Sequence, residues 1–412
     1  MRKIIEQFKL LPGFQDLINQ IENNAKIAPL GLNKAARIPM MVAIQDSVNR
    51  PILLIVENTR SALALLDDLS LFHPDFEHLY FPEPTSFFYE NAPWGENTRR
   101  QRILTLTTLA SSLIPVAPKP DKPAVIVAPI RAIMAKILPR RDFVKSTQII
   151  RSGKALNPVT FSQDLVSFGY ISTSTVVIPG QFTRRGGIID IWPPADELPS
   201  RIDFFGDEVD GLRYFDPATQ KTISKHDRIL IPPAREFILD PNKKLESEEL
   251  EWSEFHIPLL HPAPSSLMEY LPKETIVLCD DKRELRETID SLEEQAISLR
   301  EDYLNAAEFT AEYPIPYLTL PEIEERIDMF QNFELGPSGL INKASVAKSF
   351  SPEKRFGGDL PELIHYLKES VNQGSSVTVV SRQSPRLIQL WKDNLTALDE
   401  NPPIFIQGNL SE

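Results

Sequence analysis

The first residues along the chain that could do chemistry form a short loop, GLNKAARI, from Gly31 to Ile38. A phosphate-binding P-loop needs glycines that let backbone N–H groups wrap the phosphates, a lysine for charge and a hydroxyl for Mg²⁺. Aligned on this pattern, the second glycine is replaced by Ala36, the lysine by Arg37 and the hydroxyl by Ile38. Only one glycine matches, and an isoleucine cannot ligate a metal. The loop therefore predicts at most a nucleotide site that has lost its function.

Other chemical motifs are absent from the sequence. No HExxH, GxSxG, CxxC or EF-hand pattern occurs among the 412 residues, and the six histidines are scattered. His73 and His78 lie five residues apart in a loop that contains a proline, a pattern that does not favour a metal site. The single cysteine, Cys279, excludes an internal disulfide and a cysteine-based zinc site, and it fits a reducing cytoplasm. We expect no metal and no cofactor.

A third set of candidate residues is cationic. The stretch from Gly180 to Glu208 carries Arg184, Arg185 and Arg201 beside aromatic residues. The whole chain has 44 Lys and Arg against 57 Asp and Glu, a net charge of −13, which is a poor electrostatic match to DNA. Residues 148–237 are nearly balanced, with ten Lys and Arg against eleven Asp and Glu. The arginines therefore lie in the least acidic part of an acidic protein.

The elements that must position these residues follow three patterns along the chain. Residues 1–146 alternate helices with continuous apolar strands, as in a parallel sheet covered on both faces. Residues 147–237 have short, closely spaced strands with Gly and Pro turns, which predicts a small inserted α+β domain with antiparallel pairs. The long-strand pattern returns over 238–340 and completes the α/β body. Residues 341–412 predict a further small α/β domain. Exposed, hinge-like linkers are expected near 147 and 237.

The arginines are expected on a hairpin within the inserted domain. FTRRGGIIDIW and SRIDFF are each consistent with one strand, joined by the turn PPADELP. Phe205 lies four residues after Arg201, an even spacing that places both side chains on one face of a strand. Arginines beside an exposed aromatic are typical of protein–protein interface hot spots. Each arginine also has a simpler interpretation as a solvated side chain or a surface ion pair.

The segment from Gly169 to Phe237 resembles the UvrB-homology region at the N-terminus of transcription-repair coupling factors, the Mfd family. The matching phrases are PGQFTRRGGIIDIWPP, LPSRIDFFGDEVDGLRYFDPATQKT and ILIPPAREF. Fainter similarity extends over the whole chain, through GLNKAARIPMMVAIQDSVNRPILLIVEN, TIVLCDDKRELRETI and GGDLPELIHYL. The resemblance implies a helicase-like α/β body with an inserted UvrA-binding domain, in a bacterial cytoplasmic protein.

The resemblance also implies roles for individual residues. It assigns UvrA binding to Arg185, Arg201 and Phe205, with Arg184 beside them. Asp280 and Asp281 look like a remnant of the acidic site that holds the metal in working helicases. With Arg37 and Ile38 in the degenerate loop, they are expected to bind no Mg-nucleotide, so this chain is not expected to be an enzyme.

Full-length members of the family are expected to continue into an RNA-polymerase-binding domain and an ATP-dependent DNA translocase. RNA polymerase and DNA would then be partners only through parts beyond this chain, which we interpret as an N-terminal fragment that ends at Glu412. The nearest alternative is UvrB itself, an ATP-dependent helicase component that binds damaged DNA. UvrB keeps its P-loop and has a long aromatic hairpin, whereas the segment from Tyr80 to Arg102 is too short for one. A DNA-binding module is a second alternative, which the net charge disfavours.

Overall fold

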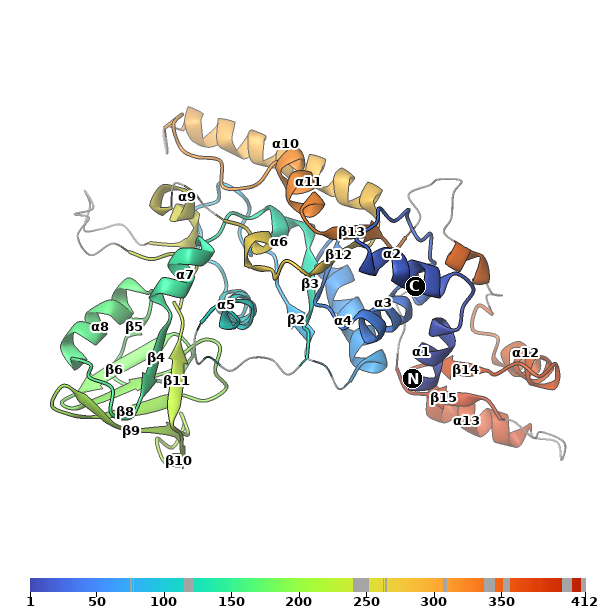
Figure 1. Ribbon diagram of the computed structural model, residues 1–412, viewed down its shortest axis with the longest axis horizontal. Helices are drawn as coiled ribbons and strands as arrows, with labels where there is room; N and C mark the ends of the chain where they lie inside the picture. The colour runs from blue at the N-terminus through green and yellow to red at the C-terminus, as the bar shows by residue number, and fades with distance from the viewer. Residues whose placement is uncertain are drawn as a thin grey trace.

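The computed structural model describes most of the chain. The described residues are 1–74, 76, 78–114, 117, 122–239, 252–261, 263, 265–306, 310–336, 345–350, 356–394 and 402–408. Figure 1 shows a central α/β body, a smaller domain beside it that contains β4 to β11, and a small C-terminal unit on the opposite side of the body. The mixed α/β class expected from the sequence is confirmed.

The body is built on a five-stranded parallel sheet with the order β13-β12-β1-β3-β2. Its strands are β1 (Ile52–Val56), β2 (His78–Tyr80), β3 (Val125–Pro129), β12 (Ile276–Cys279) and β13 (Gln331–Glu334). Strands on both sides of the inserted segment therefore share one sheet, because Ile52 pairs with both Val125 and Ile276. Residues 30–32 extend beside β13 through hydrogen bonds from the amides of Leu30 and Leu32.

Helices cover both faces of this sheet, which explains why β1 is apolar and buried at every position. Alternate β1 residues point to opposite faces: Leu53 joins a core with α5, α6, α10 and α11, and Leu54 joins a second core with α1 to α4. The helices of the body are α1 (Arg2–Lys9), α2 (Phe14–Glu22), α3 (Lys34–Val48), α4 (Thr59–Phe72), α5 (Glu96–Ser111), α6 (Ile130–Met134), α7 (Arg140–Ser146), α9 (Ile257–Leu260), α10 (Lys282–Asn305) and α11 (Leu320–Asp328).

The smaller domain pairs a six-stranded sheet with a two-stranded one. The larger sheet has the order β10-β9-β8-β7-β6-β5, and β4 pairs with β11. The elements are β4 (Gln148–Arg151), α8 (Pro158–Ser167), β5 (Ile171–Ser172), β6 (Gln181–Arg185), β7 (Ile188–Ile191), β8 (Ser200–Phe205), β9 (Glu208–Phe215), β10 (Thr222–Lys225) and β11 (Arg228–Ile231). All pairs in the six-stranded sheet are antiparallel except β5 with β6.

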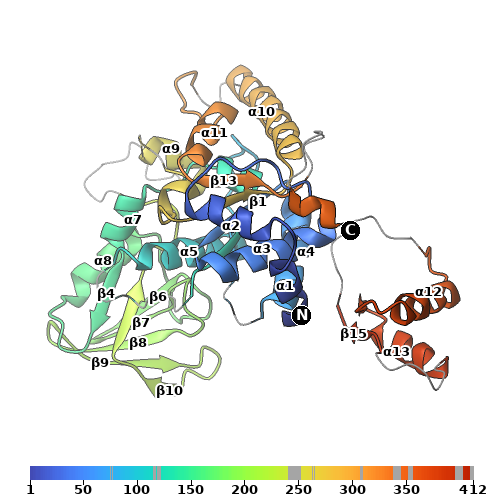
Figure 2. The same ribbon diagram turned by 45° about the vertical axis from the view of Figure 1, so that its right-hand side comes forward.

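The C-terminal unit contains α12 (Leu360–Asn372), β14 (Thr378–Val380), α13 (Ser384–Asp393) and β15 (Ile404–Ile406). Its two strands are parallel, and the helices pack on them through Ile364, Leu367 and Trp391. Figure 2 shows this unit set apart from the body. The strand–helix alternation expected over this part of the chain is present. The limits 1–146, 147–237, 238–340 and 341–412 themselves stay a prediction.

Two local expectations are wrong. FTRRGGIIDIW is not one strand: a turn at Gly186 and Gly187 divides it into β6 and β7, which pair with each other. Gly186 has a φ of 60°, which glycine adopts without steric cost. The linkers are also not exposed, because Thr147 is 9% and Phe237 2% accessible.

The exit from the smaller domain is fixed to the body instead. Arg102 of α5 is fully buried and makes a two-pronged ion pair with Glu236, at 2.5 and 3.0 Å. Its guanidinium also stacks between the rings of Phe81 and Trp94 and donates to the carbonyl of Pro82.

Candidate functional site

The six-stranded sheet has a core face and an outer face, which follow from the alternation of side chains along each strand. Ile189 of β7, Ile202 of β8 and Leu212 of β9 pack into the core beneath α8. Their neighbours Asp190, Arg201 and Arg213 point the other way. Asp190 pairs with Arg201 and Arg201 with Arg213 in the strand register, so these charges form one row across three strands.

Arg201 is held firmly within this row. Its Nε donates to Oδ1 of Asp190 at 2.6 Å and its Nη2 to Oδ2 at 2.8 Å, a bidentate pair. The guanidinium carbon lies 4.7 Å from the ring centroid of Phe215. Hydrogen bonding to Asp190 raises the pKa of Arg201, so this guanidinium keeps its charge. Since 17% of the Arg201 side chain and 3% of the Asp190 side chain remain accessible, one edge of the guanidinium still faces solvent.

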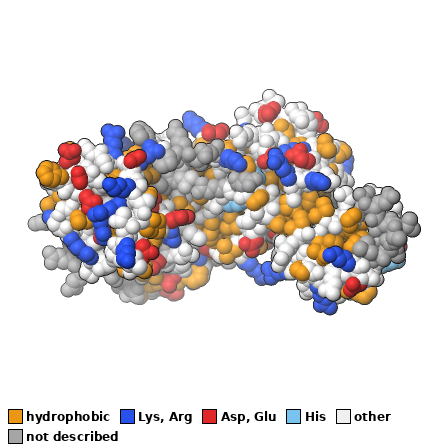
Figure 3. Space-filling model, turned by 90° about the horizontal axis from the view of Figure 1, so that it is seen from below, with side chains coloured by type: hydrophobic (Ala, Val, Ile, Leu, Met, Phe, Trp, Pro, Cys, Tyr) orange, Lys and Arg blue, Asp and Glu red, His pale blue; other side chains and the backbone are white. Residues whose placement is uncertain are grey.

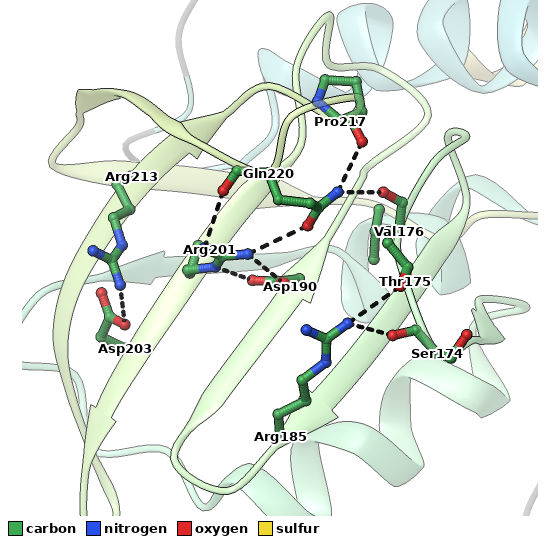
Figure 4. A network of polar contacts seen from close by, with 10 residues as sticks. All are labelled: Ser174, Thr175, Val176, Arg185, Asp190, Arg201, Asp203, Arg213, Pro217 and Gln220. Carbon is green, nitrogen blue, oxygen red and sulfur yellow. Dashed lines mark hydrogen bonds and ion pairs between the residues drawn. The ribbon is translucent and has the colours of Figure 1, made fainter.

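The two adjacent arginines of β6 point to opposite faces. Arg185 is on the outer face, where its Nη2 donates to the carbonyl of Ser174 and to Oγ1 of Thr175 (Figure 4). Arg184 alternates to the other side of the strand, is exposed, and makes no hydrogen bond or ion pair with any residue that the structure describes. The structure therefore brings Arg185 and Arg201 to one face and separates Arg184 from them.

Phe205 lies at the end of β8, on the outer side expected from its even spacing to Arg201. Its ring is 83% accessible, although Phe204 beside it packs against the core. Phe205 pairs with Glu208 across a tight turn, and the register between β8 and β9 shifts by one residue near Asp203. Such a bulge increases local strand twist and redirects side chains. An exposed phenylalanine at a sheet corner is a candidate contact residue.

The surroundings of this face are rich in charge of both signs. Figure 3 views the molecule from below and shows Lys and Arg side chains gathered at one end, interspersed with acids. On the outer face, Arg213 forms an ion pair with Asp203 at 2.8 Å, and both side chains are about a third exposed. The simpler interpretation of Arg213 as a surface ion pair is thereby confirmed. Two guanidinium nitrogens of Arg185, Nε and Nη1, make no hydrogen bond with any residue that the structure describes.

The loop from Gly31 to Ile38, predicted from the sequence to be a degenerate nucleotide loop, lies in the body. Gly31, with a φ of 68°, precedes α3, and Arg37 lies in the first turns of that helix. Arg37 Nη1 is 2.8 Å from Oδ2 of Asp280 at the end of β12, and both side chains are largely buried. The atoms are within ion-pair distance without the alignment of a hydrogen bond. The backbone of Gly336 packs directly against the guanidinium. The space beside α3 is thus occupied by the protein itself.

The remaining residues of this site have internal structural roles. The amide of Ala36 donates to the side chain of Asn33, which caps α3. In a P-loop, this N–H group would be available to bind phosphate, but here it is already hydrogen-bonded to Asn33. Ile38 is 1% accessible and belongs to the core. Asp281 does not join Asp280: it caps α10 by accepting from the amides of Arg283 and Glu284.

Sequence reasoning missed three residues of the outer face: Asp190, Phe215 and Gln220. Gln220 accepts from Arg201 Nη2 at 3.5 Å and donates to the carbonyls of Val176 and Pro217. Only Asp190 left a signal in the sequence, as an acid between isoleucines in a strand that is otherwise apolar. Its partner could not be identified before the strand register was known.

The described residues offer neither a cluster of metal ligands nor a membrane-spanning helix. No three His, Cys, Asp or Glu side chains among them come together in an arrangement that could hold a metal ion. No helix in the same part of the chain is both long enough and apolar enough to span a membrane.

Comparisons with known proteins agree with the resemblance inferred from the sequence. Residues 149–237 match the family model described as the UvrB interaction domain. The chain is 32% identical over 237 residues to the transcription-repair-coupling factor of Bacillus subtilis (strain 168), which covers 57% of this chain and 19% of that protein. It is 25% identical over 451 residues to the transcription-repair-coupling factor of Staphylococcus aureus (strain USA300), covering 97% of this chain and 38% of that protein.

The chain therefore spans less than two fifths of the length of these curated relatives. Together, the matches confirm the resemblance to the UvrB-homology region of transcription-repair coupling factors.

Proposed function

We propose that this chain is the UvrA-recruiting module of a transcription-repair coupling factor, which links stalled RNA polymerase to nucleotide excision repair. The observation that carries the proposal is the outer face of the six-stranded sheet. Within the segment that matches the UvrB interaction domain, this face presents exposed Arg185 and Phe205 beside the fixed cation of Arg201. Cations and an aromatic ring on a rigid sheet suit a partner surface that is acidic around an apolar pocket.

The parts of the coupling factor that bind RNA polymerase and move along DNA with ATP are proposed to lie beyond this chain. Within it, the Arg37–Asp280 pair supports a body that neither binds nor hydrolyses nucleotide. Isothermal calorimetry with Mg-ATP is expected to give no heat of binding, and purified protein no phosphate release. Micromolar affinity would instead favour the alternative of a UvrB-like helicase component.

The UvrA interface is tested by substitutions that spare the fold. Arg185→Ala and Phe205→Ala remove exposed side chains, so each is expected to weaken UvrA binding while the unfolding transition is unchanged. Replacing Arg201 by Glu would place two carboxylates against each other, because Asp190 is its buried partner. The suitable change is therefore the double variant Asp190→Asn/Arg201→Gln, which keeps a polar pair and the net charge.

Loss of the Arg201 cation in this double variant is expected to cost on the order of 2 kcal/mol of binding free energy or more if the partner buries it. Arg228→Ala is a control, because Arg228 opens β11 in the separate two-stranded sheet. Surface plasmon resonance with immobilised UvrA measures the affinity of the parent and of these four variants. Parent-like affinity for Arg185→Ala, Phe205→Ala and the double variant together would refute the proposed interface.

A further inference from the structure

Gln220 has a backbone conformation that glutamine rarely adopts. Its φ is 60°, in the left-handed region, where a side chain with a Cβ is strained. Only four residues other than glycine have positive φ in the described chain, and Gln220 is the one that lies in the domain with the arginine face. Strained backbone persists where the surroundings hold it, and it often marks a functional site.

The turn around Gln220 fixes this conformation from the backbone side. The amide of Gln220 donates to the carbonyl of Asp216 at 2.7 Å, and the amide of Asp216 donates to the carbonyl of Lys221 at 2.9 Å. The Asp216 carboxylate also accepts from the amide of Thr219, at 2.7 Å. The turn that joins β9 to β10 is therefore closed by its own hydrogen bonds, and it does not need the Gln220 side chain to form.

The side chain of Gln220 is directed across the sheet (Figure 4). Its Nε2 donates to the carbonyl of Pro217 at 2.8 Å and to that of Val176, on the loop between β5 and β6, at 3.4 Å. Its Oε1 and its backbone carbonyl each lie 3.5 Å from a guanidinium nitrogen of Arg201. One amide thus joins the β9–β10 turn, the β5–β6 loop and the arginine.

The β5–β6 loop carries this connection on to the second arginine. Ser174 and Thr175 accept from Arg185, and Val176, the next residue, accepts from Gln220. Val176 is fully buried, so this loop is anchored on the sheet. Arg185 and Arg201 are therefore linked through the loop and Gln220, although neither touches the other.

We infer that Gln220 is a positioning residue for the UvrA interface, which sets the rotamers of Arg201 and Arg185 before the partner arrives. This inference rests on the proposed function. Arginine side chains lose much rotamer freedom when an interface orders them, and a side chain that is already ordered avoids this cost. The association rate of two proteins depends on charge, and the Gln220 amide is uncharged. Its contribution is therefore expected in the dissociation rate of the complex.

The test is Gln220→Gly, because glycine adopts the left-handed conformation without strain. The variant removes the amide but keeps the turn, so its thermal midpoint is expected to equal or exceed that of the parent. Surface plasmon resonance with UvrA is expected to show a dissociation rate roughly three- to tenfold faster, with an unchanged association rate and salt dependence. Gln220→Asn, whose shorter amide cannot span the same gap, is expected to behave alike.

Asn49→Gly is the matched control. Asn49 also has a positive φ, of 49°, but it ends α3 in the body, far along the chain from the arginines. It is expected to leave UvrA binding unchanged.

The outcomes separate the two proposals. If Arg185→Ala and Phe205→Ala weaken binding but Gln220→Gly and Gln220→Asn do not, the positioning role is wrong and the interface stands. If none of these variants weakens binding, the proposed function itself fails. A lower thermal midpoint for Gln220→Gly that accounts for its loss of binding would assign Gln220 to folding, which also overturns the inference.

Discussion

An arginine–aspartate pair lies at the centre of both regions of this molecule, with opposite consequences. In the body, Arg37 and Asp280 meet between α3 and the end of β12, with Gly336 packed against the guanidinium. In the smaller domain, Arg201 and Asp190 meet on the open face of a sheet, and the guanidinium stacks on Phe215. The first pair is enclosed by the protein. The second presents a fixed cation to whatever approaches.

The difference lies in what surrounds each pair. Arg37 is enclosed by the chain, whereas Arg201 has exposed Arg185 on the same face of the sheet and Phe205 further along its own strand. The same two residue types can therefore form a pair inside the body or a pair on the face of a sheet. Four predictions test this contrast, beginning with the contact that joins the two regions.

Arg102→Ala is expected to have the largest effect, because it leaves Glu236 buried without its partner. Removing one member of a buried ion pair typically costs about 3–5 kcal/mol. Urea unfolding followed by tryptophan fluorescence measures the loss. The double variant Arg102→Met/Glu236→Leu is expected to recover much of it, since no charge is then buried. If the double variant is as unstable as Arg102→Ala, the loss of stability comes from losing the ion pair itself and not from the buried charge of Glu236.

Arg37→Ala and Arg201→Ala are expected to destabilise the protein by similar amounts, about 2–3 kcal/mol each, because each leaves an aspartate largely buried. Their effects on UvrA binding are expected to differ: Arg201→Ala weakens binding and Arg37→Ala does not. Denaturant unfolding and plasmon resonance on the same protein samples give both quantities. Equal losses of binding would contradict the division of roles between the two pairs.

The two regions are expected to respond to pH in opposite directions. In the smaller domain, burial raises the pKa of Asp196 to about 7 from 3.8. The folded state then binds more protons than the unfolded state between these values, so stability falls as pH rises through this window. In the body, burial and the neighbouring His73 lower the pKa of His78 to about 4 from 6.5. There the unfolded state binds more protons, so stability falls as pH is lowered below 6.5.

Matched substitutions isolate these two groups. Thermal midpoints at pH 5 and pH 7.5 are measured for the parent, Asp196→Asn and His78→Gln. Asp196→Asn is expected to stabilise the protein most at pH 7.5, and His78→Gln most at pH 5. If both variants shift the midpoint equally at the two pH values, neither group titrates between them.

Arg213→Ala is expected to have the smallest effect. Arg213 pairs with Asp203, but both side chains are about a third exposed, and such surface pairs contribute about 0–1 kcal/mol. Arg213 lies directly opposite Arg201 in the strand register. This variant therefore shows whether the loss of unfolding free energy depends on position in the sheet or on burial of the ion pair. A loss comparable to that of Arg201→Ala, measured by urea unfolding, would favour position.

Much of the body could be predicted from the sequence, because its strands are apolar at every position and its helices are clearly periodic. Residues 52–56 and 276–279 were recognisable as buried strands by composition alone. The smaller domain was harder. Because isoleucines follow the Gly-Gly turn inside FTRRGGIIDIW at once, the sequence pattern wrongly predicts a single strand. That error hid the pairing of β6 with β7.

The candidate sites were predictable only in part, for a physical reason. Arg37 and Asp280 can each be identified as candidates from residue type and position in the sequence. Their ion pair could not be predicted, because it depends on the order of the strands in the sheet. Asp190 and Gln220 act through contacts with strands and loops distant in sequence, which no local pattern encodes. Arg185, Arg201 and Phe205 were identified from the resemblance to a family. The residues that hold the two arginines became identifiable only in the structure.

The pairing of Ile52 with both Val125 and Ile276 has a consequence for how the protein emerges from the ribosome. The strands of the smaller domain are contiguous, so this domain can complete its sheets as soon as residue 231 is free. The sheet of the body cannot be completed until β12 and β13 have been synthesised. Early body strands, apolar on both faces, must therefore wait for their neighbours while the inserted domain is already folded. The nascent body is thus the part most in need of protection by chaperones during translation.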